Sequence, residues 1–281
     1  MIEAAMQPTR LKATSDGRAD LCPARVLLIG YGALGRWVAK AAEQSDEFSI
    51  ASVLVRHGRE DDVRRDLPGI DVAASLDALQ GRFDFALEVA GHEAVATHVP
   101  DLLAGGVETA IASTGALADD DLRERVIRCA SSGRTRLRLL SGAIGGLDLL
   151  AAHRAAGISR VVYTGRKPPG AWKVTAGLPS TDKECLIFQG TAREAARAFP
   201  ANANVAATIA LAGAGLDKTE VRLVADPALR HNVHHVEAES KAGAFKLEMT
   251  GWPLADNPST SALTAYSALR TLQGLTQPLD L

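Results

Sequence analysis

The stretch VLLIGYGALGRWVAKAA, residues 26–42, joins an apolar run to a helix-like pattern through three glycines. Gly30, Gly32 and Gly35 follow the spacing G-x-G-x-x-G. The first glycine permits a tight turn, the second lets the backbone approach a pyrophosphate, and the third lets the helix pack close to the strand. Backbone N–H groups at the start of the helix then face the phosphate charge. The stretch therefore predicts a strand, a turn and a helix that bind a dinucleotide.

A glycine-rich turn without a ligand can have the same spacing, so the surrounding pattern decides between the two interpretations. A strand precedes the glycines and a helix opens within them, as the dinucleotide fold requires. We therefore expect NAD or NADP as the cofactor. The second predicted strand ends at Arg56, where an acid would be needed for strict NAD use. Arg56 is either an exposed surface arginine or a partner for a 2′-phosphate, so use of NADP is expected as well.

Strand-like and helix-like segments alternate up to about residue 145. We expect strands over 25–29, 48–55, 83–91, 107–113 and 135–142, and helices over 33–45, 92–104 and 118–133. Alternation of this kind is typical of an α/β fold with a doubly wound parallel sheet. The sequence thus predicts an N-terminal Rossmann domain over residues 24–145, preceded by a flexible tail over residues 1–23.

The pattern changes after Gly145. We expect helices over 146–156, 191–198 and 202–215, and strands over 158–165, 219–226, 233–240 and 244–251. Consecutive strands favour a C-terminal α+β domain with a mixed or antiparallel sheet, assigned to residues 146–255. Residues 256–281 are expected to form a C-terminal helix, entered through Asn257-Pro258, that packs back on the Rossmann domain.

The composition excludes several classes of function. The chain has 281 residues, of which 47% are hydrophobic and 23% charged, as in an ordinary soluble globular protein. A net charge of −2 and 4% aromatic residues disfavour binding to nucleic acid. The sequence has no long apolar run, so neither a membrane span nor a signal peptide is predicted. Three scattered cysteines suggest no disulfide framework and no metal site, which fits the cytoplasm.

One histidine can be assigned to a face of its strand. In NVHHVEAES, residues 232–240, side chains alternate between the two faces. His235 shares the solvent side with Glu237 and Glu239, whereas His234 shares the covered side with two apolar residues. His234 is therefore either a hydrogen-bonded core histidine or a general base near neutral pH. The sequence has no G-x-S-x-G elbow, H-E-x-x-H pair or P-loop lysine that would indicate another chemistry.

Several segments together resemble the L-aspartate dehydrogenase family, over about residues 24–273. They are IGYGALG (29–35), STGALAD (113–119), SGAIGGLD (141–148), GRKPP (165–169), PANANVAATIALAG (200–213), ADPALRHNVHHVEAES (225–240) and NPSTSALTAYSAL (257–269). This combination is more specific than the glycine loop alone. Dihydrodipicolinate reductase and homoserine dehydrogenase are related folds with the same two-domain plan.

The resemblance implies oxidation of L-aspartate with NAD or NADP to iminoaspartate, which water converts to oxaloacetate and ammonia. Iminoaspartate could alternatively feed NAD biosynthesis. The family's catalytic histidine follows an Asn-x-His pattern, here Asn232-Val233-His234, and it would position or activate water or the substrate amine. A homodimer is also implied.

The resemblance further implies cofactor contacts in the glycine loop, in the loop from Ser113 to Ala116, and in two later segments. With Arg56, the predicted cofactor-binding residues are Gly30, Gly32, Ala33, Leu34, Gly35, Arg56, Ser113, Ala116, Ala143 and Asn204. Asn204 is also placed to cap a helix.

A substrate with two carboxylates needs cationic or N–H donors. Arg166 and Lys167 are the best candidates, with Thr164 weaker and Asn232 beside the catalytic pattern. A solvated Arg-Lys loop is the other interpretation of this pair. At the level of function, two alternatives remain open. One is a reductase of the dihydrodipicolinate or homoserine dehydrogenase type, and the other is a non-catalytic nucleotide-sensing protein.

Overall fold

The computed structural model describes residues 12–13, 19–20, 22–172, 183–200, 203–255 and 257–278. Most of the predicted tail, residues 1–23, lies outside these residues; within it, two short strands, β1 (Lys12–Ala13) and β2 (Ala19–Asp20), pair antiparallel. The chain divides into two compact units: Met1–Leu140 with Ala265–Leu281, and Ser141–Thr264. The domain ranges 24–145, 146–255 and 256–281 stay predictions.

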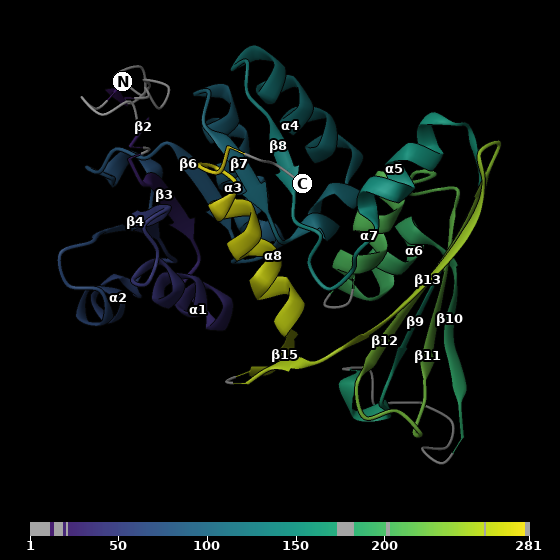
Figure 1. Ribbon diagram of the computed structural model, residues 1–281. Helices are drawn as coiled ribbons and strands as arrows, with labels where there is room; N and C mark the ends of the chain where they lie inside the picture. The colour runs from purple at the N-terminus through teal and green to yellow at the C-terminus, as the bar shows by residue number, and fades with distance from the viewer. Residues whose placement is uncertain are drawn as a thin grey trace. The chain divides into compact units, whose positions relative to one another are not determined.

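The N-terminal unit is built on a six-stranded sheet in the order β5-β4-β3-β6-β7-β8 (Figure 1). All neighbouring pairs are parallel, which confirms the predicted doubly wound α/β class. The strands are β3 (Ala24–Ile29), β4 (Phe48–Leu54), β5 (Asp71–Ala73), β6 (Phe85–Glu88), β7 (Glu108–Ile111) and β8 (Leu137–Leu139).

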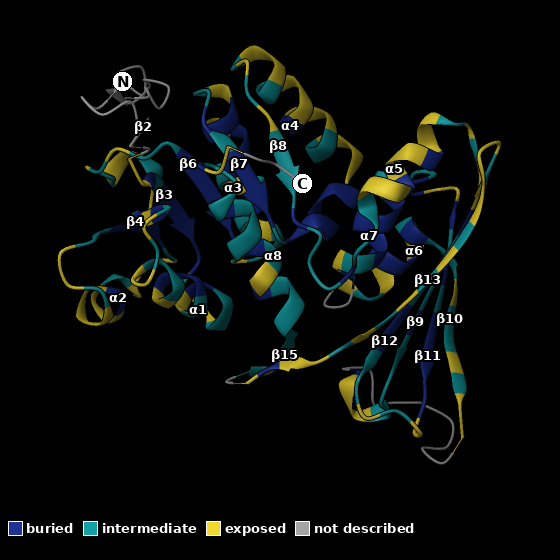
Figure 2. Ribbon diagram, viewed as in Figure 1, coloured by how far each residue is buried: buried dark blue, intermediate teal, exposed yellow. Residues whose placement is uncertain are grey.

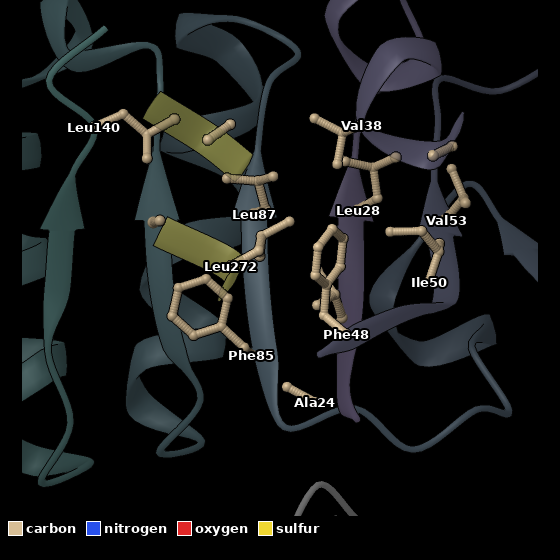
Figure 3. Close-up of a cluster of buried hydrophobic side chains, with 14 of the residues drawn as sticks. Ala24, Leu28, Val38, Phe48, Ile50, Val53, Phe85, Leu87, Leu140 and Leu272 are labelled. Carbon is tan, nitrogen blue, oxygen red and sulfur yellow. The ribbon is translucent and has the colours of Figure 1, made fainter. Parts of the chain in front are cut away.

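Both faces of this sheet are covered, and the alternation along β3 shows how. Leu28 packs in one cluster with Val38 of α1 (Ala33–Ala42) and Leu272 of α8 (Ala262–Gln273), as Figure 3 shows. The next residue, Ile29, belongs to a second cluster with Leu102 of α3 (His92–Ala104). Successive side chains of one strand thus supply two cores, which is why the strand reads as a continuous apolar run.

The prediction for the end of the chain is partly wrong. The helix does not start at residue 257, because Asn257–Ser261 form strand β15, which pairs with β14 (Pro253–Leu254). The helix α8 begins at Ala262. Pro258 disfavours helical geometry in the residue before it and favours an extended one.

The N-terminal unit has elements that the sequence did not reveal. They are α2 (Glu60–Asp66), the edge strand β5 and a one-turn helix, η2 (Leu76–Ala78). The remaining helices of the unit are η3 (Thr114–Ala118) and α4 (Asp120–Ser132). Helix α4 begins at Asp120, two residues after the predicted start, and Asp119 caps it by accepting a hydrogen bond from the Leu122 N–H.

The C-terminal unit is built on a five-stranded mixed sheet in the order β10-β11-β9-β12-β13. Strands β9 and β11 are parallel and the other pairs are antiparallel, which confirms the expected mixed sheet. The strands are β9 (Ile158–Lys167), β10 (Cys185–Thr191), β11 (Thr219–Ala225), β12 (Asn232–Ser240) and β13 (Gly243–Gly251). Strand β10 was not predicted, and β13 is exposed along much of its length (Figure 2).

Three helices of the same unit pack against this sheet: α5 (Leu147–Ala155), α6 (Ala192–Ala198) and α7 (Ala203–Ala212). A one-turn helix, η4 (Pro169–Ala171), follows β9. Helix α6 begins with a capping box between Thr191 and Glu194. None of the helices described is both long and apolar enough to cross a membrane.

Candidate active site

The glycine loop has the geometry that its spacing predicts. Gly30 has φ +101°, a conformation that side chains rarely adopt, and a Cβ there would lie 2.7 Å from the Ala90 Cβ. A Cβ at Gly35 would lie 2.2 Å from the carbonyl oxygen of Gly30. A Cβ at Gly32, in contrast, would meet no atom of the described chain within 4 Å. Gly30 and Gly35 thus shape the turn, and Gly32 leaves a space that fits an approaching pyrophosphate.

A cavity of about 540 Å³ opens at this loop within the N-terminal unit. Its lining comes from the turn after β3, the end of β4 and the turn after β6. Arg56, His57 and Arg59 line it together with Gly32, whereas Ala33 and Leu34 begin helix α1. The cavity therefore combines free space at a helix N-terminus with cationic side chains, which suits a phosphorylated ligand.

A buried glutamate that sequence analysis missed organises the carboxyl end of two neighbouring strands of this sheet. Glu88 ends β6 and is 0% exposed. It accepts hydrogen bonds from the N–H groups of Ala90 and Gly91, both at 2.7 Å, and from the Ser113 hydroxyl at 2.9 Å and N–H at 3.1 Å. Burial raises the Glu88 pKa, and these donors oppose the shift. Glu88 therefore fixes the loops after β6 and β7.

The other predicted cofactor residues fall in both units. Ser113 precedes η3, which contains Ala116, and both residues are buried in the N-terminal unit. Ala143 and Asn204 belong to the C-terminal unit, where Asn204 is exposed in the first turn of α7. Contact between these four residues and a cofactor stays a prediction.

His234 lies on the covered face of β12 and is 3% exposed. Its neighbours on that face, Val236 and Ala238, are 2% and 1% exposed. The opposite face carries His235, which is half-buried, and Glu239, which is exposed. The burial pattern therefore agrees with the faces expected from alternation. The catalytic role of His234 stays a prediction.

His234 has an aromatic partner on the neighbouring strand. The Tyr163 hydroxyl lies 2.8 Å from His234 Nδ1, and the two rings are stacked with centroids 6.0 Å apart. Burial raises the pKa of Tyr163 far above its usual value. Burial, and secondarily the charge of Lys167, lowers the His234 pKa to about 4. His234 is therefore a neutral imidazole at neutral pH, beside a protonated phenol.

Lys167 shares the face of Tyr163, because the two residues are four positions apart on β9. Its Nζ lies 4.9 Å from the centroid of the Trp172 ring, and burial lowers its pKa to about 8. The Trp172 side chain is 1% exposed, and its indole N–H has no hydrogen-bond partner among the described residues. A cation and an indole donor thus lie together on the His234 side of the sheet.

The remaining predicted substrate residues lie on different faces of the C-terminal sheet. Asn232 alternates with His234 and shares its face, whereas Thr164 and Arg166 pair with residues of the opposite face. The Arg166 guanidinium forms ion pairs of 2.6 Å with buried Asp226 and 2.7 Å with Glu184. Within the described residues, no three metal-ligating side chains lie together. Substrate contact by these residues stays a prediction.

Fold and cavity place the N-terminal unit in the class of NAD-binding Rossmann domains. Residues 30–140 match the family described as the NAD binding domain of homoserine dehydrogenase. Residues 148–275, which contain His234 and Lys167, match the family described as the C-terminal part of aspartate dehydrogenase. Both halves of the expected two-domain plan are thereby supported.

The whole chain is similar to aspartate dehydrogenases. It is 44% identical to an L-aspartate dehydrogenase of Ralstonia nicotianae, covering 88% of this chain and 96% of the relative. The crystal structure of aspartate dehydrogenase from Thermotoga maritima has a TM-score of 0.73 and 31% identity, covering 92% of this chain and 99% of that one. Dihydrodipicolinate reductase from Paenisporosarcina sp. TG-14, at 16% identity and a TM-score of 0.51 over 90% and 95%, shares the fold alone. The chain belongs to the L-aspartate dehydrogenase family, which confirms the predicted resemblance.

Proposed function

We propose that this protein oxidises L-aspartate with NAD or NADP. The observation that carries the proposal is the 44% identity that extends over 96% of the Ralstonia enzyme. Aspartate, water and oxidised cofactor give oxaloacetate, ammonium, reduced cofactor and one proton. The oxidised cofactor, when bound, supplies a hydride acceptor. Gly30, Gly32 and Gly35 would hold its pyrophosphate, and the Ser113–Ala116 loop, braced by Glu88, would contribute further contacts.

Lys167 would bind a carboxylate of aspartate. Its ammonium lies over the Trp172 ring and beside a buried histidine, so it is held on the face where the substrate would react. The indole N–H of Trp172, which has no hydrogen-bond partner among the described residues, would supply a second donor to the substrate carboxylates. With a pKa near 8, Lys167 is mostly cationic at neutral pH.

His234 would act on the reacting end of aspartate. A neutral imidazole can donate from one nitrogen and accept at the other, so it can orient the amine, a carboxylate oxygen or the water that adds to iminoaspartate. Asn232, on the same face, would orient the same groups. Arg166 and Thr164 are assigned a supporting role, because Arg166 already pairs with two carboxylates.

We also infer a cytoplasmic homodimer with a Rossmann domain over 24–145, a substrate domain over 146–255 and a C-terminal segment over 256–281. Free thiols at Cys22, Cys129 and Cys185 support a reducing compartment. The exposed edge strand β13 supports a surface for subunit contact. Light scattering of the purified protein tests the dimer directly.

The test of function is an assay with L-aspartate and each oxidised cofactor at alkaline pH. We expect the absorbance of reduced nicotinamide to increase in this assay. In the reverse assay, with oxaloacetate, ammonia and reduced cofactor, we expect that absorbance to decrease. Binding of cofactor without turnover in either direction would support the nucleotide-sensing alternative. Turnover only with a cyclic imine or an aldehyde would support the reductase alternative.

A further inference from the structure

The two ring nitrogens of His234 differ, because Nδ1 already has a partner in the Tyr163 hydroxyl at 2.8 Å. We propose that Tyr163 is a positioning residue: its hydroxyl donates to His234 Nδ1, so that the imidazole carries its proton on Nε2 and offers an N–H donor to the substrate. This inference rests on the proposed function, in which His234 acts on aspartate.

The strand register brings the two side chains together. His234 of β12 lies directly opposite Gly165 of β9, and Tyr163 lies opposite Val236. Tyr163 and His234 are therefore diagonal neighbours on one face, a separation that an aromatic side chain can span. Both are almost fully buried, at 2% and 3% exposed, so bulk water does not compete for the hydrogen bond.

Gly165 keeps the path between them open. A Cβ at this position would lie 2.7 Å from the Tyr163 hydroxyl oxygen and 3.1 Å from Cζ. Gly165 has no positive φ, so its backbone is one that any residue could adopt. The reason for glycine here is therefore steric: the Tyr163 ring crosses the space that a side chain would fill.

The direction of the hydrogen bond follows from the protons available. Burial keeps the Tyr163 phenol protonated, and a buried hydroxyl proton needs an acceptor. Among the described residues, the hydroxyl is hydrogen-bonded to His234 Nδ1 alone. A neutral imidazole that accepts at Nδ1 carries its hydrogen on Nε2.

This tautomer narrows what His234 does. An N–H on Nε2 donates to an oxygen, such as a carboxylate of aspartate or the carbonyl of oxaloacetate in the reverse reaction. Removal of a proton from water by Nε2 would require the other tautomer. The hydrogen bond from Tyr163 therefore makes His234 a donor that orients the substrate.

The direct test uses ¹⁵N-labelled histidine and NMR, with His234→Gln to assign the His234 signals among the seven histidines. We expect a protonated Nε2 and an unprotonated Nδ1 in the unmodified protein at neutral pH. In Tyr163→Phe, which keeps the ring and removes the hydroxyl, both tautomers should appear. The same variant should lower kcat about tenfold, as expected for the loss of one hydrogen bond, with the Kd for cofactor unchanged.

Gly165 offers a second, independent variant. Gly165→Ala should displace the Tyr163 hydroxyl and lower kcat similarly. In the Tyr163→Phe background the closest clash is gone, so the added effect of Gly165→Ala should be several-fold smaller. Tyr266→Phe is the matched control, because it removes the same hydroxyl from a side chain that is 57% exposed and belongs to the other unit.

Two results would overturn the proposal. One is a protonated Nδ1 in the unmodified protein. The other is a kcat within twofold of the unmodified protein in Tyr163→Phe. If the unmodified protein does not oxidise aspartate at all, the proposed function fails by itself. The ring-nitrogen signals need no substrate, so they still decide whether Tyr163 sets the tautomer.

Discussion

The cofactor cavity and the His234 site are built in opposite ways. The glycine loop works through its backbone, and its key residues lie within six positions of one another, from Gly30 to Gly35. The His234 site works through side chains from β9, β12 and the segment after η4, which only the strand register brings together. The first kind of site is visible in a short stretch of sequence, and the second depends on pairing between distant segments.

The strongest test of this difference is His234→Ala. We expect kcat to fall about 10²–10⁴-fold, because a positioned acid, base or donor contributes about this much. The Kd for cofactor, measured by fluorescence titration, should stay unchanged because the glycine loop is intact. His235→Ala is the matched control, since His235 lies on the opposite face of the same strand. Equal losses in both variants would contradict the assignment by strand face.

Acid should destabilise the protein through the same histidine. The His234 pKa is about 4 in the folded chain and 6.5 in the unfolded chain, so the unfolded state binds the proton first as pH falls. The free energy of unfolding should therefore decrease between pH 6.5 and 4, by up to about 3 kcal/mol from this group. Urea unfolding at several pH values measures it, and His234→Gln should remove this part of the slope. Identical slopes for the two proteins would refute the prediction.

The glycine loop can be divided into a packing part and a binding part. Gly35→Ala should lower the free energy of unfolding by about 1–3 kcal/mol, because its Cβ would overlap the Gly30 carbonyl. Gly32→Ala should change stability by about 0.5 kcal/mol or less, yet weaken cofactor binding about tenfold, since its Cβ points into open space. Thermal unfolding and cofactor titration of both variants provide the measurements. Strong destabilisation by Gly32→Ala would contradict this division.

The smallest expected effect concerns cofactor choice. Arg56→Ala should raise the Kd for NADP about tenfold and leave the Kd for NAD unchanged, because a charge-assisted hydrogen bond to the 2′-phosphate is lost. Arg65→Ala is the control: Arg65 is 75% exposed on α2 and pairs with Asp62. If the Kd values for NAD and NADP rise equally in Arg56→Ala, Arg56 does not bind the 2′-phosphate.

Most of the N-terminal fold could be predicted because its strands are apolar runs separated by clearly amphipathic or capped helices. Helix α3 spans His92–Ala104 as expected. The missed elements are short or charged: β5 has three residues, and α2, EDDVRRD, buries only Val63. Such segments form because neighbouring strands and helices stabilise them, a contribution that local pattern does not contain.

The site was predicted less completely. Alternation along β12 separated His234 from His235, since that depends on one strand alone. Glu88 was missed because a single acid at the end of an apolar strand carries no signal of burial. Its four hydrogen bonds come from two loops that follow it in the sequence, and a local pattern does not show them. Tyr163 was missed because its partner, His234, lies 71 positions away in the sequence. Trp172 was missed because only the fold of the segment after β9 brings its ring to Lys167.

The sequence by itself determined the dinucleotide loop, the parallel sheet and the family. The loop and the sheet follow from patterns of residues close together in the chain, and the family follows from several segments taken together. The tertiary structure alone decided that Tyr163 reaches His234 across Gly165, that β9 continues through Arg166 to Lys167, and that Glu88 braces two loops. These relations arise from strand register and burial. Register moves every side chain of a strand together, so it is settled only when the whole sheet has formed.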